Sequence, residues 1–126
     1  MIGQFIAVGI GGAIGSMARF GIGRISMAYW PNLAFPLATL LINWLGCFLM
    51  GVLMLGLQHA QLPVRWQPFI GVGILGGFTT FSAFSLEATL LWQRGEPGLA
   101  AAYVGLSVVG GIAALIAGMA LARTIL

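Results

Sequence analysis

Hydroxyl side chains and phenyl rings alternate between residues 76 and 85, which read GGFTTFSAFS. Phe81 and Phe84 are spaced i, i+3, so they share one face of a helix, and Phe78 extends the row. A phenyl ring has a negative face and a positive edge. Ring edges turned inward would attract an anion, faces turned inward would attract a cation, and plain core packing would use neither. The hydroxyl of Ser82 lies between Phe81 and Phe84 in the sequence.

Further hydrogen-bond donors recur in two other apolar stretches. The amide of Asn43 carries two N–H donors, and Thr39 lies one helical turn before it. Tyr103 and Ser107 are spaced i, i+4 and therefore share a helix face. A single serine or threonine usually bonds to its own helix. Because such groups occur on three separate apolar stretches, we expect them to form a polar pathway through the protein.

Residues suited to enzyme chemistry are scarce. His59 lies in a polar connection, Cys47 has no base nearby, and the two carboxylates, Glu87 and Glu96, are not paired in the sequence. A catalytic site needs a nucleophile with a base, a carboxylate pair or a set of metal ligands. The sequence therefore predicts that the protein is not an enzyme. Glu87 itself could face the pathway, an arginine or an interface.

The composition is that of a membrane protein. The chain has 126 residues, of which 60% are hydrophobic and 6% charged, with neither lysine nor aspartate. A soluble domain carries about 25% charged residues. The net charge of +3 comes from dispersed arginines, whereas nucleic-acid binding needs clustered Lys and Arg. We expect the lipid membrane to be the surroundings of the chain and nucleic acid not to be a partner.

Four stretches are long enough to cross a bilayer, which takes about 20 mostly apolar residues. We expect an all-α membrane protein in which residues 1–126 form a single four-helix transmembrane domain. Its polar connections are short, and the one after the second span covers residues 58–65. The expected spans cover residues 4–27, 36–57, 66–92 and 99–123.

The third span is expected to be broken at about residues 76–80, where two glycines precede the hydroxyl-rich run. Within a bilayer, broken helices occur only where protein or water surrounds them. The break would free backbone carbonyls, which are suitable ligands for Na⁺. Near a two-fold axis, two chains could each supply two such carbonyls to one buried structural ion.

Arginines are divided almost evenly between the two sides of the membrane. Along four spans, one side receives Arg65 and Arg123, and the other receives Arg24 and Arg94, with Arg19 just inside the bilayer. Since Lys/Arg bias in short loops sets orientation, this balance predicts insertion in both orientations. Small residues four apart, such as those at 11 and 15, favour close helix packing. Together these features predict an antiparallel, dual-topology homodimer.

Arg19 is the deepest cation in the chain. Within a span an arginine is costly unless it snorkels to the interface or serves a function. It would either form an anion-attracting vestibule or anchor the helix at the interface.

Three ordered motifs resemble those of the Fluc (CrcB) fluoride channels. They are GGAIGSMARF at 11–20, PLATLLINWLG at 36–46 and GGFTTFSAFS at 76–85. The resemblance covers the chain in length, helix number and motif order. It departs from the family pattern at Ala83, where hydroxyl residues are common, and at Phe20, where tyrosine often follows the arginine.

This resemblance implies a passive fluoride exporter in the inner (plasma) membrane, with two antiparallel pores at the interface of a homodimer and a central structural Na⁺. It implies that Gly76 and Thr79 give backbone carbonyls to Na⁺ and that Arg19 lies near the entrance. The pore lining that it implies comprises Asn43, Phe81, Phe84, Ser82, Tyr103, Ser107 and Thr39.

The main alternative is a small multidrug-type exporter, which is also a four-helix antiparallel dimer. Proton-coupled export of cationic compounds needs a membrane carboxylate, typically in the first helix. The first span has none, and Glu87 is the only candidate. A noncatalytic helical assembly subunit is a third possibility, but it would not need the Asn/Thr/Phe set.

Overall fold

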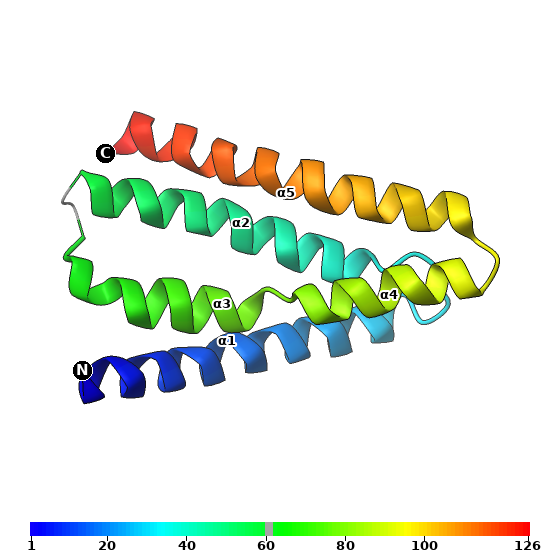
Figure 1. Ribbon diagram of the computed structural model, residues 1–126, viewed down its shortest axis with the longest axis horizontal. Helices are drawn as coiled ribbons and strands as arrows, with labels where there is room; N and C mark the ends of the chain where they lie inside the picture. The colour runs from blue at the N-terminus through cyan, green and yellow to red at the C-terminus, as the bar shows by residue number, and fades with distance from the viewer. Residues whose placement is uncertain (60–61) are drawn as a thin grey trace.

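Four long apolar segments run side by side in the computed structural model, which describes residues 1–59 and 62–126 (Figure 1). Two residues of the expected 58–65 connection, Ala60 and Gln61, lie outside the described part. The segments are α1 (Ile2–Tyr29), α2 (Leu37–Gln58), a composite third segment (Val64–Gln93) and α5 (Pro97–Ile125). The expected all-α architecture with four long apolar helices is confirmed for the described residues.

The third segment is assembled from several short pieces. It contains η1 (Val64–Trp66), the π-helix η2 (Pro68–Leu75), α3 (Gly76–Phe78) and α4 (Phe81–Gln93). The interruption lies at Thr79 and Thr80, whose backbone is extended at φ −79°, ψ 157° and φ −147°, ψ 123°. It falls within the expected range of 76–80. The glycines do not cause it, because Gly76 keeps a helical φ of −64° and ψ of −39°.

The glycines of the third segment serve close packing against α1 instead. A Cβ added to Gly77 would lie 2.6 Å from the carbonyl oxygen of Gly12. From the other side, a Cβ on Gly15 would collide with the carbonyl of Ile74. Small residues let helix backbones approach this closely in membranes. The expectation of tight packing through the small residues at 11 and 15 is therefore confirmed.

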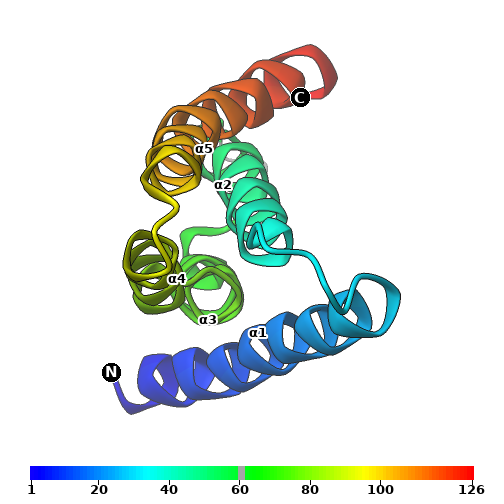
Figure 2. The same cartoon turned by 90° about the vertical axis from the view of Figure 1, so that its right-hand side faces the viewer.

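A second close approach joins α2 to α5. A Cβ on Gly51 would collide with the carbonyl of Leu115, and a Cβ on Gly118 with the carbonyl of Phe48. Seen along the bundle, α5 packs on α2 and α4, while α1 covers η2 and α3 (Figure 2). The bundle thus consists of two glycine-packed pairs that are joined by the interrupted segment.

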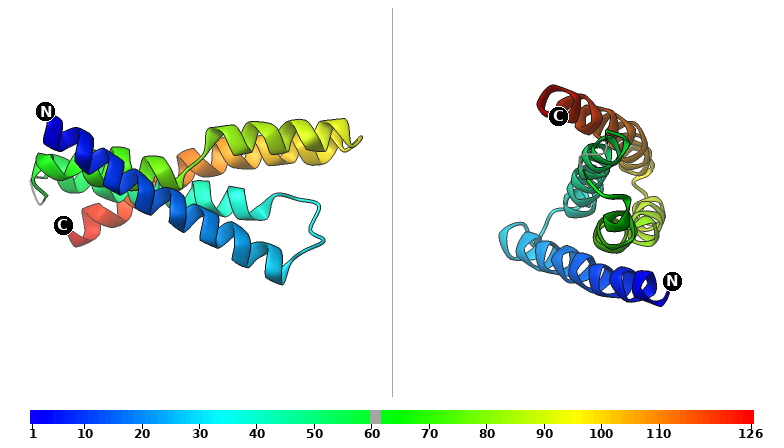
Figure 3. Two further views of the ribbon diagram at one scale, coloured as in Figure 1. Left: turned by 90° about the horizontal axis from the view of Figure 1, so that it is seen from below. Right: turned by 90° about the vertical axis from the view of Figure 1, so that its left-hand side faces the viewer.

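Helix ends follow local sequence signals. Pro97 occupies the first turn of α5, where its missing N–H costs no hydrogen bond, so this helix starts two residues before the expected span. Gly95 has a φ of +76° and lets the chain turn between α4 and α5. Both termini lie at the same end of the bundle, as four crossings require (Figure 3).

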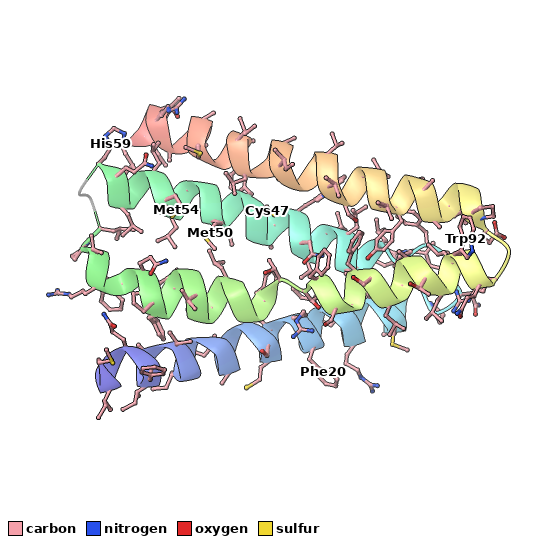
Figure 4. The ribbon with its side chains drawn as sticks, in the orientation of Figure 1. Phe20, Cys47, Met50, Met54, His59 and Trp92 are labelled. Carbon is pink, nitrogen blue, oxygen red and sulfur yellow. The ribbon has the colours of Figure 1, made fainter. Side chains whose placement is uncertain are left out.

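A cluster of buried side chains lies between α2, α4 and α5. Leu40, Leu91, Ala100 and Tyr103 form this cluster, and Tyr103 is completely buried. Elsewhere the molecule exposes many large apolar side chains. One example is Phe20, which projects from α1 away from the other helices (Figure 4). Such an apolar surface suits a chain surrounded by lipid or by another copy.

Candidate functional site

Asn43 holds the interruption in the third segment. Its Oδ1 accepts a 2.8 Å hydrogen bond from the N–H of Thr80, and its Nδ2 donates a 3.1 Å bond to the carbonyl of Thr80. One amide side chain therefore satisfies both backbone groups of an extended residue inside the bundle. Since Nδ2 carries two hydrogens, one N–H remains for another acceptor.

The carbonyls of Gly76 and Thr79 are among those that lose their helical donors at the interruption. In a continuous helix the N–H of residue i bonds to the carbonyl of residue i−4. The N–H of Thr80 bonds to Asn43 instead of Gly76, and the N–H of Ala83 bonds to the Thr80 hydroxyl, 3.2 Å away, instead of Thr79. Thr80 thereby caps the start of α4, a role that threonine favours.

A groove of about 300 Å³ opens beside the interruption. We call it the break groove, and it runs between α2, α4 and α5. None of its lining residues is charged. It brings together five predicted site residues, Asn43, Thr79, Phe81, Phe84 and Ser107, with Gly46, Cys47, Met50, Thr80, Val108 and Leu115.

The two phenylalanines of the break groove differ in burial. Phe81 is 78% exposed, whereas Phe84 is partly buried against Tyr103. Their ring centroids lie 5.6 Å apart, with an angle of 47° between the ring planes. Met50, another lining residue, points from α2 toward the third segment (Figure 4). One side of the groove is thus open at the surface of the chain.

Ser107 and Ser82 have contrasting surroundings. The buried Oγ of Ser107 has no hydrogen-bond partner among the described residues. A buried hydroxyl without a partner is uncommon and needs an explanation. Ser82 is exposed, and its Oγ lies 3.4 Å from the hydroxyl of Thr80. Of the two, only Ser107 lines the break groove.

The remaining predicted pore hydroxyls point at Glu87. Its Oε1 accepts a 2.8 Å bond from Thr39 and its Oε2 a 2.7 Å bond from Tyr103. The Tyr103 ring packs on Phe84 and on Phe35, with centroid distances of 5.3 and 5.5 Å. Neither Thr39 nor Tyr103 lines the break groove. The hydrogen bonds of Glu87 thus join α4 to α2 and α5.

A second groove, of about 330 Å³, lies between α1, α2 and α4. We call it the arginine groove. The Nε of the partly buried Arg19 donates a 3.1 Å bond to the carbonyl of Gly77, so this side chain is bound at the interrupted segment. The groove is lined by Arg19, Phe20, Gly23, Arg24, Ser26, Met27, Ala38, Thr39, Ile42, Thr80, Ala83 and Glu87.

Thr80 lines both grooves and is the residue at which they meet. Sequence reasoning counted it among the hydroxyls but gave it no role. The signal that could have identified it is a threonine directly before the start of a helix, the preferred position for a cap. No comparable signal exists for the partners of Glu87, because they come from helices distant in sequence.

A cation at the interruption would have to be held by backbone oxygens. Among the described residues, no three His, Cys, Asp or Glu side chains come close enough to hold a metal ion. The carbonyls of Gly76 and Thr79, which have lost their helical donors, fit the oxygen chemistry expected of a sodium site. One chain offers too few of them to surround an ion.

Comparisons with known proteins extend the resemblance to the whole chain. Residues 6–119 match the family described as CrcB-like protein, Camphor Resistance (CrcB). A Cereibacter sphaeroides protein named fluoride-specific ion channel FluC is 51% identical over 123 residues, covering 98% of this chain and 97% of the relative. Proteins of that name from Novosphingobium aromaticivorans and Rhodospirillum centenum are 50% and 46% identical, covering 92% and 96% of this chain and 93% and 96% of theirs.

Proposed function

This chain belongs to the CrcB family, and from that membership we propose that it is a fluoride-specific ion channel that exports fluoride passively across the inner (plasma) membrane. It is a multi-pass membrane protein with four helices long enough to span a bilayer, and it is not an enzyme. The structural observation that carries the proposal is the break groove. It joins an amide donor, an unpaired hydroxyl and two phenyl rings without a fixed charge.

This lining suits an ion that holds its water tightly. Moving an unpaired ion into an apolar medium would cost tens of kcal/mol by idealised solvation estimates. The free N–H of Asn43, the hydroxyl of Ser107 and the ring edges of Phe81 and Phe84 would replace that water. Conduction needs binding that is weak and repeated, and uncharged donors meet this need better than an arginine. Chloride, which is larger, would gain less from each donor.

The two grooves suggest the direction of the path. Fluoride would gather in the arginine groove, pass Thr80 and continue along Phe84 and Phe81. Thr39 and Tyr103 lie beside this route, with both hydroxyls bonded to Glu87. A passing anion would compete with the Glu87 carboxylate for these donors, which gives Thr39 and Tyr103 a part in the polar track. Ser82, close to the Thr80 hydroxyl, would extend the track at the open side.

A second copy of the chain would complete the pore. The break groove is open on one side and Phe81 is largely exposed, so a single chain does not enclose a path there. The near balance of arginines supports a partner inserted in the opposite orientation, as in transporters built from inverted repeats. Such an antiparallel homodimer has two equivalent break grooves and therefore two pores.

A central Na⁺ follows from the same symmetry. The carbonyls of Gly76 and Thr79 would hold it, two from each chain, in a role that is structural and adds positive potential near the pores. Support comes from the loss of their helical donors to Asn43 and Thr80. The exposed position of Gly76 leaves its carbonyl accessible to an ion shared with a partner.

Passive conduction is sufficient for detoxification. Hydrogen fluoride crosses membranes as a neutral molecule and ionises in a less acidic cytoplasm, where fluoride accumulates. The membrane potential then drives export with about 2.3 kcal/mol per 100 mV for each charge. No second substrate or energy source is needed.

Flux measurements in proteoliposomes test this function. With a K⁺ gradient clamped by valinomycin, we expect rapid fluoride efflux and no chloride efflux. The multidrug-type alternative depends on Glu87, the only side-chain carboxylate within a span. Proton-coupled uptake of a cationic drug that Glu87→Gln abolishes, without any fluoride efflux, would establish that alternative instead.

A further inference from the structure

A third groove, of about 460 Å³, lies where the start of α1 meets the start of the third segment. It is at the end of the molecule that carries the chain termini, away from the α4–α5 connection (Figure 1). We call it the Arg65 groove. Its lining consists of Gly3, Ile6, Ala7, Ile10, Arg65, Trp66 and Phe69.

The charge of Arg65 is uncompensated within this groove. The chain has two carboxylate side chains, Glu87 and Glu96. The first is bonded to Thr39 and Tyr103, and the second lies in the α4–α5 connection at the opposite end. The break groove has no charged lining residue, and the arginine groove contains the carboxylate of Glu87 beside its arginines. The lining of the Arg65 groove differs from both, because it combines one cation with an apolar wall and contains no carboxylate.

The wall of the groove is shaped for a hydrocarbon chain. Ile6 and Ile10 are one turn apart on α1 and remain 57% and 54% exposed. A Cβ added to Gly3 would meet nothing within 4 Å, so the space beside it is open. From Gly3 to Ile10 the helix rises about 10 Å, which is most of one leaflet of a hydrocarbon core about 30 Å thick.

Aromatic residues place the cation at the depth of lipid headgroups. Trp66 follows Arg65 directly, and its ring contacts Phe69 edge to face at a centroid distance of 6.1 Å. Tryptophan is enriched at the membrane–water interface, with its apolar body toward the lipid acyl chains. The guanidinium of Arg65 would thus lie beside the phosphates while the groove runs toward the bilayer centre.

We propose that the Arg65 groove binds one anionic phospholipid per chain, in a site separate from the ion path. The planar guanidinium of Arg65 takes two phosphate oxygens, and one acyl chain lies along Ile6 and Ile10. Basic pockets between membrane helices are a known form of headgroup site. A zwitterionic lipid fits the groove less well, because its own cationic group reduces the attraction to Arg65.

Native mass spectrometry of the full-length protein in detergent tests this site, with phosphatidylglycerol and phosphatidylcholine of identical chains as probes. Wild type should retain one phosphatidylglycerol per chain at a concentration at least about tenfold below that needed for phosphatidylcholine. Arg65→Gln should remove this preference. Arg123→Gln is the matched control, because it removes an arginine in the last turn of α5, at the same end but outside the groove.

Filling the groove provides an independent variant. Ala7→Leu should weaken retention of both lipids, since it occupies the acyl-chain wall without changing charge. Equal retention of the two lipids by wild type, or a preference that survives Arg65→Gln, overturns the proposal. A second copy occupying the groove would instead appear as a loss of dimer mass in Ala7→Leu with no lipid preference in wild type, which also overturns it.

Discussion

The break groove and the arginine groove meet at Thr80 but contain opposite chemistries. The break groove has no charged side chain, whereas the arginine groove has Arg19, Arg24 and Glu87. Fixed charge raises the local concentration of a counter-ion, but a site that conducts must also release the ion. Under the proposed function, we expect a division of labour in which the arginine groove attracts the anion and the break groove conducts it.

The largest effect on efflux is expected from Asn43→Asp, which changes a residue that lines the break groove. The substitution removes the donor to the Thr80 carbonyl and adds a negative charge to the break groove. An unsatisfied buried group costs about 1–3 kcal/mol, the equivalent of about 5- to 160-fold. Because the new carboxylate also repels the anion, fluoride efflux should fall by about 100-fold or more. Efflux from proteoliposomes measures this, and size-exclusion chromatography checks that the variant keeps the oligomeric state of the wild type. Efflux close to that of wild type would remove Asn43 from the path.

Phe81→Ile should lower efflux strongly while sparing the fold. Phe81 is 78% exposed in the chain, so loss of its ring leaves little of the core unpacked, whereas the proposed path loses a ring edge. We expect a decrease of about 10- to 100-fold, the equivalent of about 1.4–2.8 kcal/mol in the barrier. Phe5→Ile is the matched control, since Phe5 is 73% exposed on α1 and lines neither groove. Equal efflux in both variants would mean that Phe81 serves packing and does not line the path.

Ser107→Ala removes one uncharged donor from the break groove. The hydroxyl has no partner among the described residues, so no internal hydrogen bond is lost there. A single hydrogen bond contributes about 0.5–1.5 kcal/mol, and we expect efflux to fall roughly 3- to 10-fold. Ser85→Ala is the control, because Ser85 lines neither groove. An unchanged rate in Ser107→Ala would place the path elsewhere.

The smallest effect is expected from Arg24→Gln on the attracting side. Arg24 is exposed, so its field is screened within about 10 Å at 0.1 M salt. Efflux should decrease about two- to threefold at low ionic strength and recover at high ionic strength. Arg94→Gln, outside both grooves, should not respond. A loss as large as that of Phe81→Ile at every salt concentration would make Arg24 part of the conducting path.

Much of the fold could be predicted from the sequence because it depends on local properties. The lengths of the apolar stretches predicted four spans, and the small residues at 11 and 15 predicted close helix packing. The position of the interruption was predicted, but its cause was not. Gly76 keeps helical dihedral angles, and Gly77 packs closely against the backbone of Gly12. The interruption falls at Thr79 and Thr80, where the amide of Asn43 replaces helical hydrogen bonds.

The candidate site was predicted in part for the same reason. Residue type and helix face pointed to Asn43, Phe81, Phe84 and Ser107, which share the break groove. The sequence could not show that Thr39 and Tyr103 both donate to Glu87, because three helices must first be packed in register. Nor could it show that Thr80 joins the two grooves. These contacts depend on tertiary structure, and residue spacing along one helix cannot predict them.

Parallel recordings of fluoride efflux from Phe81→Ile and Arg24→Gln proteoliposomes, at low and high ionic strength, test the division of labour most directly. We expect Phe81→Ile to stay impaired at both ionic strengths and Arg24→Gln to approach the wild-type rate at the higher one. If both variants recover with salt, or if Phe81→Ile conducts normally while Arg24→Gln is blocked at every salt concentration, the break groove is not the conducting side.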